Sequence, residues 1–228
     1  MADVIVITRM AALTRSTAQG WRALVIQQCA KLARMPIPIP IDDRLERAAQ
    51  LVLRSRIFLD IWFYFESRDT RAAIIDTMRC FNEFFRFAPH AHFVAYVVHI
   101  AALFEKRRDT INLPSLVREV KSANLISPEA ATEVDALLSQ AGPLAAKVTI
   151  LRNNVFAHRS ASISYDDVYK EAAVRPDQLR DLTELALGIA NKLLLARGLG
   201  EHFFNELPRQ DAEAMLKALA QKEPVGGP

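Results

Sequence analysis

The sequence predicts an all-α protein folded as an up-and-down helical bundle, and three observations lead to this prediction. From Asp42 onward, segment after segment has the apolar spacing of an amphipathic helix, often with proline or serine at its start. Two of these segments carry long, matched apolar seams. The sequence contains no alternating strand pattern between hairpin turns and no repeat of fixed period.

The first predicted helices fall in the aromatic-rich part of the chain. Residues 42–67 begin with acidic side chains and carry an apolar stripe at Leu51, Phe58, Trp62 and Phe65. A second helix starts at Asp69, and Pro89 ends it. A third covers Ala91 to Phe104, an apolar run of about 14 residues where a membrane helix needs ~20, so we expect a buried core helix.

The later predicted helices have clear start signals. Residues 112–123 carry proline near the first turn, and the segment from Ser127 has this serine as N-cap and Pro128 at the first helical position. The last core helix, within residues 175–200, begins with proline and ends at glycine. These signals separate the bundle into distinct helices.

Matched seams predict which helices are neighbours. The first seam runs through Leu137, Ala141, Leu144, Val148, Leu151 and Val155. The second runs through Leu179, Leu182, Ala186, Ile189, Leu193 and Ala196. Both have the spacing of three and four that packs one helix against another. Gly142 and Pro143 interrupt the first seam, so we expect the helix to be kinked or divided there.

Composition bounds the class of protein. The 228 residues are 51% hydrophobic, enough for a substantial core. Only Cys29 and Cys80 are cysteines, which excludes a disulfide framework and favours the reducing cytoplasm. No apolar run is long enough to span a membrane. We expect a basic N-terminal extension over 1–41, the helical bundle over 42–205, and a C-terminal helix or tail over 206–228.

The N-terminal extension carries most of the excess positive charge. Positions 1–35 contain five basic residues and one acid, so a chain of net charge +3 has a nearly neutral body. Any RNA contact must then rely on local charge rather than on a basic surface. The extension is either an organellar presequence or an upstream stretch before a true start at Met35, and we favour the second.

The stretch LRNNVFAHRS, residues 151–160, is the candidate reaction centre. His158 continues the first seam three residues beyond Val155, where the apolar residues end. On an α-helix, Arg152 and His158 would lie ~9 Å apart along the axis and ~120° apart around it. They could line a groove, with Asn154 close in angle to His158 and Arg159 on the same stripe as Arg152.

These residue types suit a phosphodiester substrate. An arginine offers a permanent, planar, multi-donor charge for phosphate oxygens. A histidine can accept and return a proton near neutral pH, and an asparagine can orient either group. We find no carboxylate cluster for a metal ion and predict neither a metal nor another cofactor.

Each candidate also has a structural interpretation. Arg152 could pair with a neighbouring carboxylate while His158 closes the end of the bundle. His92 and His99, with no third ligand, are best explained by core packing, as are the aromatic residues between Phe58 and Phe104. The charge run EKRRD, residues 105–109, is most simply a solvated helix end.

LRNNVFAHRS resembles the AbiU-like abortive-infection branch of the HEPN superfamily. The flanking stretches FVAYVVHIAALFEKRRDTINLPSLVREV and YDDVYKEAAVRPDQLRDLTELALGIANKLL resemble it in pattern and order, so that the likeness covers about Leu45 to Gly200. The resemblance implies an up-and-down bundle that commonly dimerises, and metal-independent RNA cleavage in the active members. It assigns Arg152 as the motif arginine, Asn153 as the polar residue after it and His158 as the motif histidine.

Three hypotheses follow for function. The first is a dimeric, metal-independent endoribonuclease in phage defence or a toxin-like role, leaving 2′,3′-cyclic phosphate ends. Arg152, Asn153 and His158 would be catalytic, while Asn154 and Arg159 would contact the substrate. The second is a non-catalytic module that binds RNA, a nucleotide or a protein, and the third is a purely structural bundle. Possible partners are an antitoxin or a nucleotidyltransferase-like protein.

Overall fold

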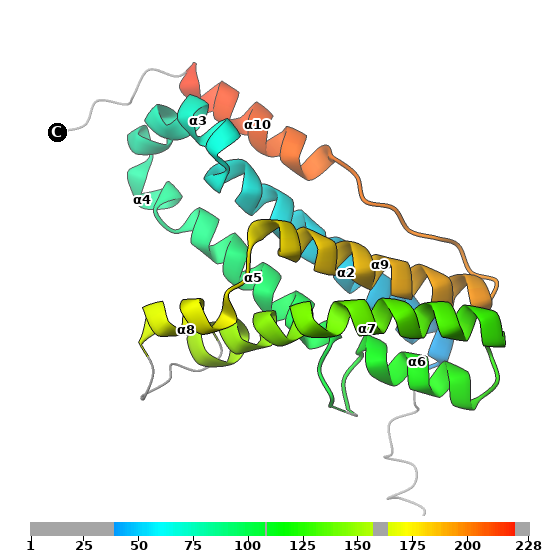
Figure 1. The fold of residues 1–228 in the computed structure, drawn as a ribbon. Helices are drawn as coiled ribbons and strands as arrows, with labels where there is room; N and C mark the ends of the chain where they lie inside the picture. Colours follow the sequence, from blue (N-terminus) through cyan, green and yellow to red (C-terminus); the bar gives the residue numbers. More distant parts are fainter. Residues whose placement is uncertain (1–38, 108, 157–163, 222–228) are drawn as a thin grey trace, which may run out of the picture. The chain divides into compact units, whose positions relative to one another are not determined.

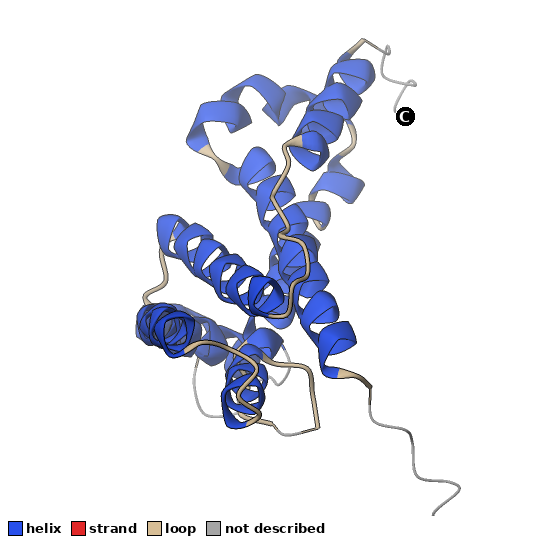
Figure 2. Ribbon diagram, turned by 90° about the vertical axis from the view of Figure 1, so that its right-hand side faces the viewer, coloured by secondary structure: helices blue, strands red, loops and turns tan. Residues whose placement is uncertain are grey.

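Four long helices form the core of the protein. The computed structural model describes residues 39–107, 109–156 and 164–221, and within them all regular structure is helical (Figures 1 and 2). The core helices are α2 (Ile41–Glu66), α5 (Ala88–Leu103), α7 (Pro128–Leu151) and α9 (Pro176–Ala196). Helix α2 packs against α5 and α9, and α7 packs against the same two. The predicted all-α class is confirmed.

The core helices alternate in direction. Asp42 at the start of α2 pairs with Arg197 at the end of α9, and Arg56 late in α2 pairs with Glu184 early in α9. The two helices therefore run antiparallel. Helix α5 is antiparallel to α2, since Trp62 contacts Phe93 while Phe58 contacts His99. The order up, down, up, down matches the predicted bundle.

Both predicted seams are part of this core. Ala141, Val148 and Leu151 of α7 are buried, and so are the members of the α9 seam from Leu179 to Leu193. Burying one such aliphatic side chain contributes about 1.5–3 kcal/mol, so this interface accounts for much of the stability of the bundle. The two helices lie side by side (Figure 1).

Helix α7 is not divided at Pro143. It continues from Pro128 to Leu151 with this proline inside. Pro143 and Gly142 are exposed, and a Cβ added at Gly142 would meet no atom within 4 Å. The carbonyl of Ser139, which loses its helical N–H partner to the proline, therefore lies on the side of the helix that faces water. Solvation at this position lets the helix continue.

Tyr96 ties α5 to α9 through a buried hydroxyl. This hydroxyl donates to the carbonyl of Leu179 at 2.8 Å and lies 3.1 Å from Oγ1 of Thr183. Tyr96 is fully buried, and burial raises the pKa of its phenol. The phenol therefore remains protonated as a donor, and its hydroxyl is not left unpaired in the core; the carbonyl of Leu179 also accepts from the hydroxyl of Thr183.

The shorter helices surround this core. Helix α6 (Leu113–Ser122) packs on α9, α2 and α7, and α8 (Tyr165–Ala172) packs on α7. The predicted helix from Asp69 is two helices, α3 (Arg68–Cys80) and α4 (Asn82–Phe85). Pro89 does not end this segment but lies in the first turn of α5, where its missing N–H removes no helical hydrogen bond.

Helix α10 (Leu207–Ala220) covers the end of α2. It packs on α2 and α3 through a second apolar cluster that includes Tyr64, Phe65, Ile74 and Leu216. Figure 1 shows α3, α4 and α10 together at one end of α2, away from α6. Helix α10 thus extends the bundle beyond its four-helix core.

Candidate functional site

The candidate motif begins on a π-helix. Helix α7 ends at Leu151, and a π-helical segment η1 (Arg152–Phe156) continues it. A π-turn bonds residue i to i+5 and is wider than an α-turn, and such turns occur frequently at functional sites. The ~120° separation expected for an α-helix therefore does not apply across η1. Leu151 and Val155 are buried, as the seam predicts.

Arg152 is held by Glu105. Its Nη2 lies 2.7 Å from Oε1 of this carboxylate, which follows the end of α5. The side chain of Arg152 is 29% exposed and that of Glu105 is 14% exposed. An ion pair so withdrawn from solvent is screened less than a surface pair, so it orients the guanidinium.

The other donors of Arg152 differ in environment. Nη1 donates to Oδ1 of Asn153 at 3.3 Å. Nε is buried and lacks a hydrogen-bond partner among the described residues. A guanidinium has five N–H groups, so donors remain after Glu105 and Asn153 have each accepted one. Arg152 could therefore contact a phosphate without leaving its carboxylate.

The structure brings together only part of the predicted site. Asn153 is exposed beside Arg152, whereas Asn154 is half-buried. His158 and Arg159 lie outside the described residues. Ser164, near the motif, caps α8 by accepting a hydrogen bond from the N–H of Asp167.

Glu105 and His90 are the neighbours of η1 that the sequence did not indicate. Glu105 belongs to the charge run expected to be a solvated helix end, which is wrong for this residue. The ring of His90, an exposed residue in the first turns of α5, lies 5.9 Å from that of Phe156, edge to face. Phe156 also meets Phe93, with ring centroids 5.8 Å apart. The carboxylate of Glu105 and the imidazole of His90 therefore both contact residues of η1.

The other histidines of α5 pack in the bundle. Nδ1 of His92 lies 2.7 Å from the carbonyl of Ala88, and Nδ1 of His99 lies 2.8 Å from that of Ala95. Phe58 contacts both imidazole rings. These contacts agree with the core packing predicted for both residues.

The aromatic-rich segment is not all core. Most of its rings are buried or half-buried, but Phe81, Phe84 and Phe87 are 36%, 61% and 59% exposed. They lie on α4 and in the turns on either side of it. The interpretation of the whole segment as packed core is wrong for these three, because α4 is a single turn that cannot bury all its faces.

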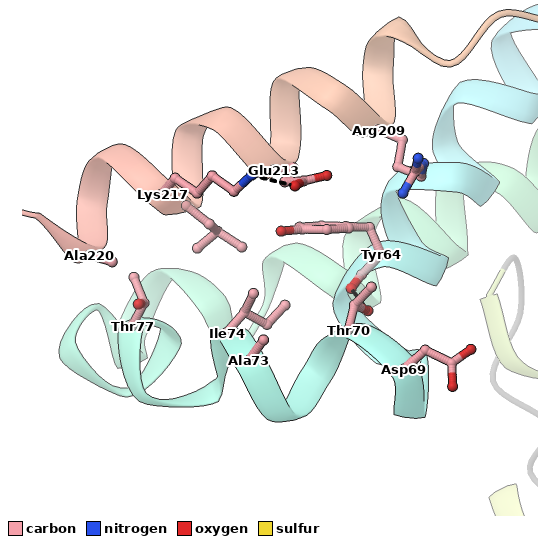
Figure 3. Close-up of a pocket in the computed structure, with 11 residues that line it drawn as sticks. Tyr64, Asp69, Thr70, Ala73, Ile74, Thr77, Arg209, Glu213, Lys217 and Ala220 are labelled. Atoms are coloured by element: carbon pink, nitrogen blue, oxygen red, sulfur yellow. Dashed lines mark hydrogen bonds and ion pairs between the residues drawn. The ribbon is translucent and has the colours of Figure 1, made fainter.

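A separate cavity lies between α3 and α10 (Figure 3). It has a volume of 260 Å³, and the hydroxyl of Tyr64 points into it beside Glu213 and Lys217. Burial raises the pKa of Tyr64, and the carboxylate of Glu213 adds to this shift. Lys217 is paired with Glu213 at 2.6 Å, and Arg209 is paired with Glu206 at 3.0 Å. Both cations are paired, as Arg152 is, so ion pairing does not distinguish the two places; η1 is the candidate site because the motif residues Arg152 and Asn153 lie on it.

Residues 39–107, 109–156 and 164–221 contain no group of three or more His, Cys, Asp or Glu side chains that could hold a metal ion. Within the same ranges, every helix is too short or too polar to cross a membrane.

The fold and the comparisons together define the class of protein. An all-helical, up-and-down bundle is what a HEPN domain requires, and the family model HEPN_AbiU2, described as AbiU2, matches residues 41–215. The match covers more than half of the chain, so the protein belongs to the AbiU2 family of HEPN domains. No curated protein and no solved structure gave a significant match.

Proposed function

We propose that this protein is a metal-independent endoribonuclease with a phage-defence or toxin-like role in the cytoplasm. We assign the activity to a dimer whose bundle spans residues 42–205. The observation that supports it best is the oriented, partly exposed guanidinium of Arg152 at the start of a π-helix. Membership of the AbiU2 family supports the same assignment.

The proposed reaction is an internal transesterification of RNA. His158 takes the proton of the 2′-hydroxyl as this oxygen attacks phosphorus. The bond from phosphorus to the 5′-oxygen breaks, and that oxygen receives a proton from His158 of the other subunit. Arg152 neutralises the charge that builds on the phosphate oxygens, and Asn153 orients Arg152. The products are a 2′,3′-cyclic phosphate and a 5′-hydroxyl.

Asn154 and Arg159 have a weaker part in this proposal. Both flank the motif in sequence, so we assign them contacts with the RNA outside the scissile phosphate. Neither residue supplies the proton transfer, and replacing either one with alanine is expected to weaken binding more than the cleavage rate. An antitoxin or a nucleotidyltransferase-like protein is the proposed regulatory partner.

A non-catalytic binding module is the alternative, and one observation favours it. Glu105 neutralises much of the charge of Arg152 at 2.7 Å. A partly neutralised guanidinium is a weaker stabiliser of developing charge, yet it can still recognise a phosphate or a carboxylate through its free N–H groups. In this alternative the same residues bind RNA, a nucleotide or a protein partner without cutting it.

The test is cleavage of RNA by the purified full-length chain with a chelator present. We expect wild type to cut and to leave 2′,3′-cyclic phosphate ends, while Arg152→Ala and His158→Ala lose activity by about a hundredfold or more. The control is Arg118→Ala, since Arg118 is an exposed arginine on α6. RNA binding without cleavage by wild type would establish the binding module instead. Unchanged cleavage in both motif variants would refute the assigned site.

A further inference from the structure

The cavity between α3 and α10 is bordered by short side chains. Helix α3 contributes Thr70, Ala73 and Thr77 to its wall, at a spacing of three and four along one face. Ala220 lies on the side of α10. These side chains do not fill the space between the two helices, so a volume of 260 Å³ remains (Figure 3). Ala73 and Ala220 are also exposed, which leaves the cavity accessible from solvent.

Tyr64, near the end of α2, presents an unpaired hydroxyl to this cavity. The residue is only 6% exposed, and its hydroxyl points into the cavity (Figure 3). This hydroxyl forms no hydrogen bond within the described part of the chain. By contrast, the buried hydroxyl of Tyr96 has two partners in the core, Leu179 and Thr183. Because buried polar groups nearly always have a partner, the Tyr64 hydroxyl is placed to receive one from outside the chain.

The charges around this phenol leave no place for a charged ligand. Lys217 pairs with Glu213 at 2.6 Å. Arg209 pairs with Glu206 at 3.0 Å. The other charged residue of the wall, Asp69, is exposed, and its carboxylate points away from the phenol hydroxyl (Figure 3). An ion beside the hydroxyl would therefore lose hydration without meeting an unpaired opposite charge.

Apolar side chains and the size of the cavity define the rest of the ligand. Ile74 and Leu216, which are 7% and 2% exposed, line the cavity together with Tyr64. A cavity of about 150 Å³ already admits benzene. The 260 Å³ between α3 and α10 therefore accommodates one six-membered ring and a small substituent. Such a ring gains from leaving water for these apolar walls.

We propose that this cavity binds a small uncharged molecule, about the size of one six-membered ring, that carries a hydroxyl or carbonyl group. This group exchanges a hydrogen bond with the hydroxyl of Tyr64, and the ring packs against Ile74 and Leu216. The ligand contacts α2, α3 and α10 at once, so its binding stabilises the contact among these helices. The site is separate from η1, which packs on α5, α7 and α8, and the proposal does not depend on the nuclease activity.

Phenol and benzene are the probes that test the hydrogen bond. We expect both to bind the full-length chain in isothermal titration calorimetry and to raise its melting temperature. Tyr64→Phe should weaken the binding of phenol by about fivefold and leave the binding of benzene unchanged, because only phenol can use the lost hydroxyl. The melting temperature of this variant without a probe should equal that of wild type, since the hydroxyl has no partner in the described part of the chain.

Ala73→Leu tests the location of the site. A leucine at this wall position occupies part of the cavity, so the affinity for both probes should fall by about tenfold or more. Ala73 is exposed on α3, and far-UV circular dichroism should show that the fold is retained. The matched control is Ala72→Leu, because Ala72 is exposed on the same helix and does not line the cavity.

Benzoate and benzylammonium test the charge of the ligand. Both contain one ring, and each should bind about tenfold or more weakly than phenol. Tighter binding of either ion than of phenol would overturn the uncharged class. Failure of phenol to bind would show that the cavity holds water only, and equal phenol affinity in wild type, Tyr64→Phe and Ala73→Leu would place binding elsewhere. Either result would overturn the proposal, whatever the outcome of the RNA cleavage assay.

Discussion

Glu105 and Arg152 join the end of one core helix to the start of the π-helix. Their side chains meet at 2.7 Å, with only 14% and 29% of their surfaces exposed. The carboxylate therefore fixes the direction of the guanidinium and at the same time lowers its effective charge. Any anionic ligand of Arg152 must bind in the presence of this neighbouring negative charge.

Glu105→Gln is expected to separate RNA affinity from the rate of cleavage. The amide keeps the shape but removes the negative charge, so RNA should bind about threefold more tightly. The guanidinium is then less firmly oriented, and the rate at saturating RNA should fall by about tenfold. Single-turnover cleavage over a range of protein concentrations measures both quantities.

Asp109→Asn is the matched control for this change. Asp109 is exposed and pairs with Arg107 in the same segment. Its replacement should leave both affinity and rate within about twofold of wild type, as expected for an exposed pair. If Glu105→Gln gives the same small effects, Glu105 does not position Arg152 for the reaction.

Tyr96→Phe is expected to destabilise the bundle. The change removes a hydroxyl that donates to Leu179 and meets Thr183 in the buried contact between α5 and α9. We expect the free energy of unfolding to fall by about 1–2 kcal/mol, with an unchanged denaturant slope. Urea unfolding of Tyr96→Phe, Thr183→Val and the double variant would show an interaction energy between the two sites. Strict additivity would contradict the shared hydrogen bond.

Pro143→Ala is expected to stabilise the protein. Alanine restores an N–H for the carbonyl of Ser139 and has a much higher helix propensity, while the greater freedom of the unfolded chain offsets part of this gain. We expect a net gain of about 1–2 kcal/mol in thermal or urea unfolding. Pro128→Ala, at the first position of α7, should give no gain because proline is well tolerated there. Equal effects at both positions would show that the helical location is irrelevant.

The ion pair between Arg44 and Glu119 predicts a small acid-dependent loss of stability. Arg44 donates to both carboxylate oxygens, at 2.7 and 2.5 Å, and this bond holds the pKa of Glu119 below its usual value of 4.5. The unfolded chain therefore binds the proton more readily than the folded chain does. The contribution is fully present above pH 4.5 and is lost as the pH falls through the lower pKa of the folded state.

The magnitude follows from the exposure of the pair. Glu119 is 45% exposed, so solvent screening limits the contribution to about 0.5 kcal/mol. Glu119→Gln should remove this part of the acid dependence when urea unfolding is measured at neutral and acidic pH. Glu171→Gln serves as the control, because Glu171 is exposed and has no ion pair in the described part of the chain. An identical pH profile for wild type and Glu119→Gln would contradict the prediction.

Much of the fold could be predicted because apolar spacing determines which helix faces are buried. The seams from Ala141 to Leu151 and from Leu179 to Leu193 lie where their periodicity requires. The continuity of α7 through Pro143 could not be predicted, since it depends on exposure of that turn to water. Helix α8 was not predicted, although Ser164 with Asp167 three residues later is an N-terminal capping pattern.

The site was less predictable than the fold. Arg152 and Asn153 lie together because they are adjacent, as any helical geometry would require. The pairing of Arg152 with Glu105 depends on how α5 lies against η1, and a charge run does not show which of its members turns inward. The exposure of Phe84 likewise follows from the length of α4, which aromatic content does not reveal.

In the π-helical segment η1, the number of residues between two positions does not give the angle between their side chains by the α-helical rule. Each π-turn accommodates one more residue than an α-turn for nearly the same advance along the axis. A relative with one residue fewer between Leu151 and Phe156 could therefore keep the same buried side chains by forming an α-turn. In a comparison with such a relative, equivalent positions are better matched outward from the buried residues Leu151 and Val155 than by counting residues from Arg152.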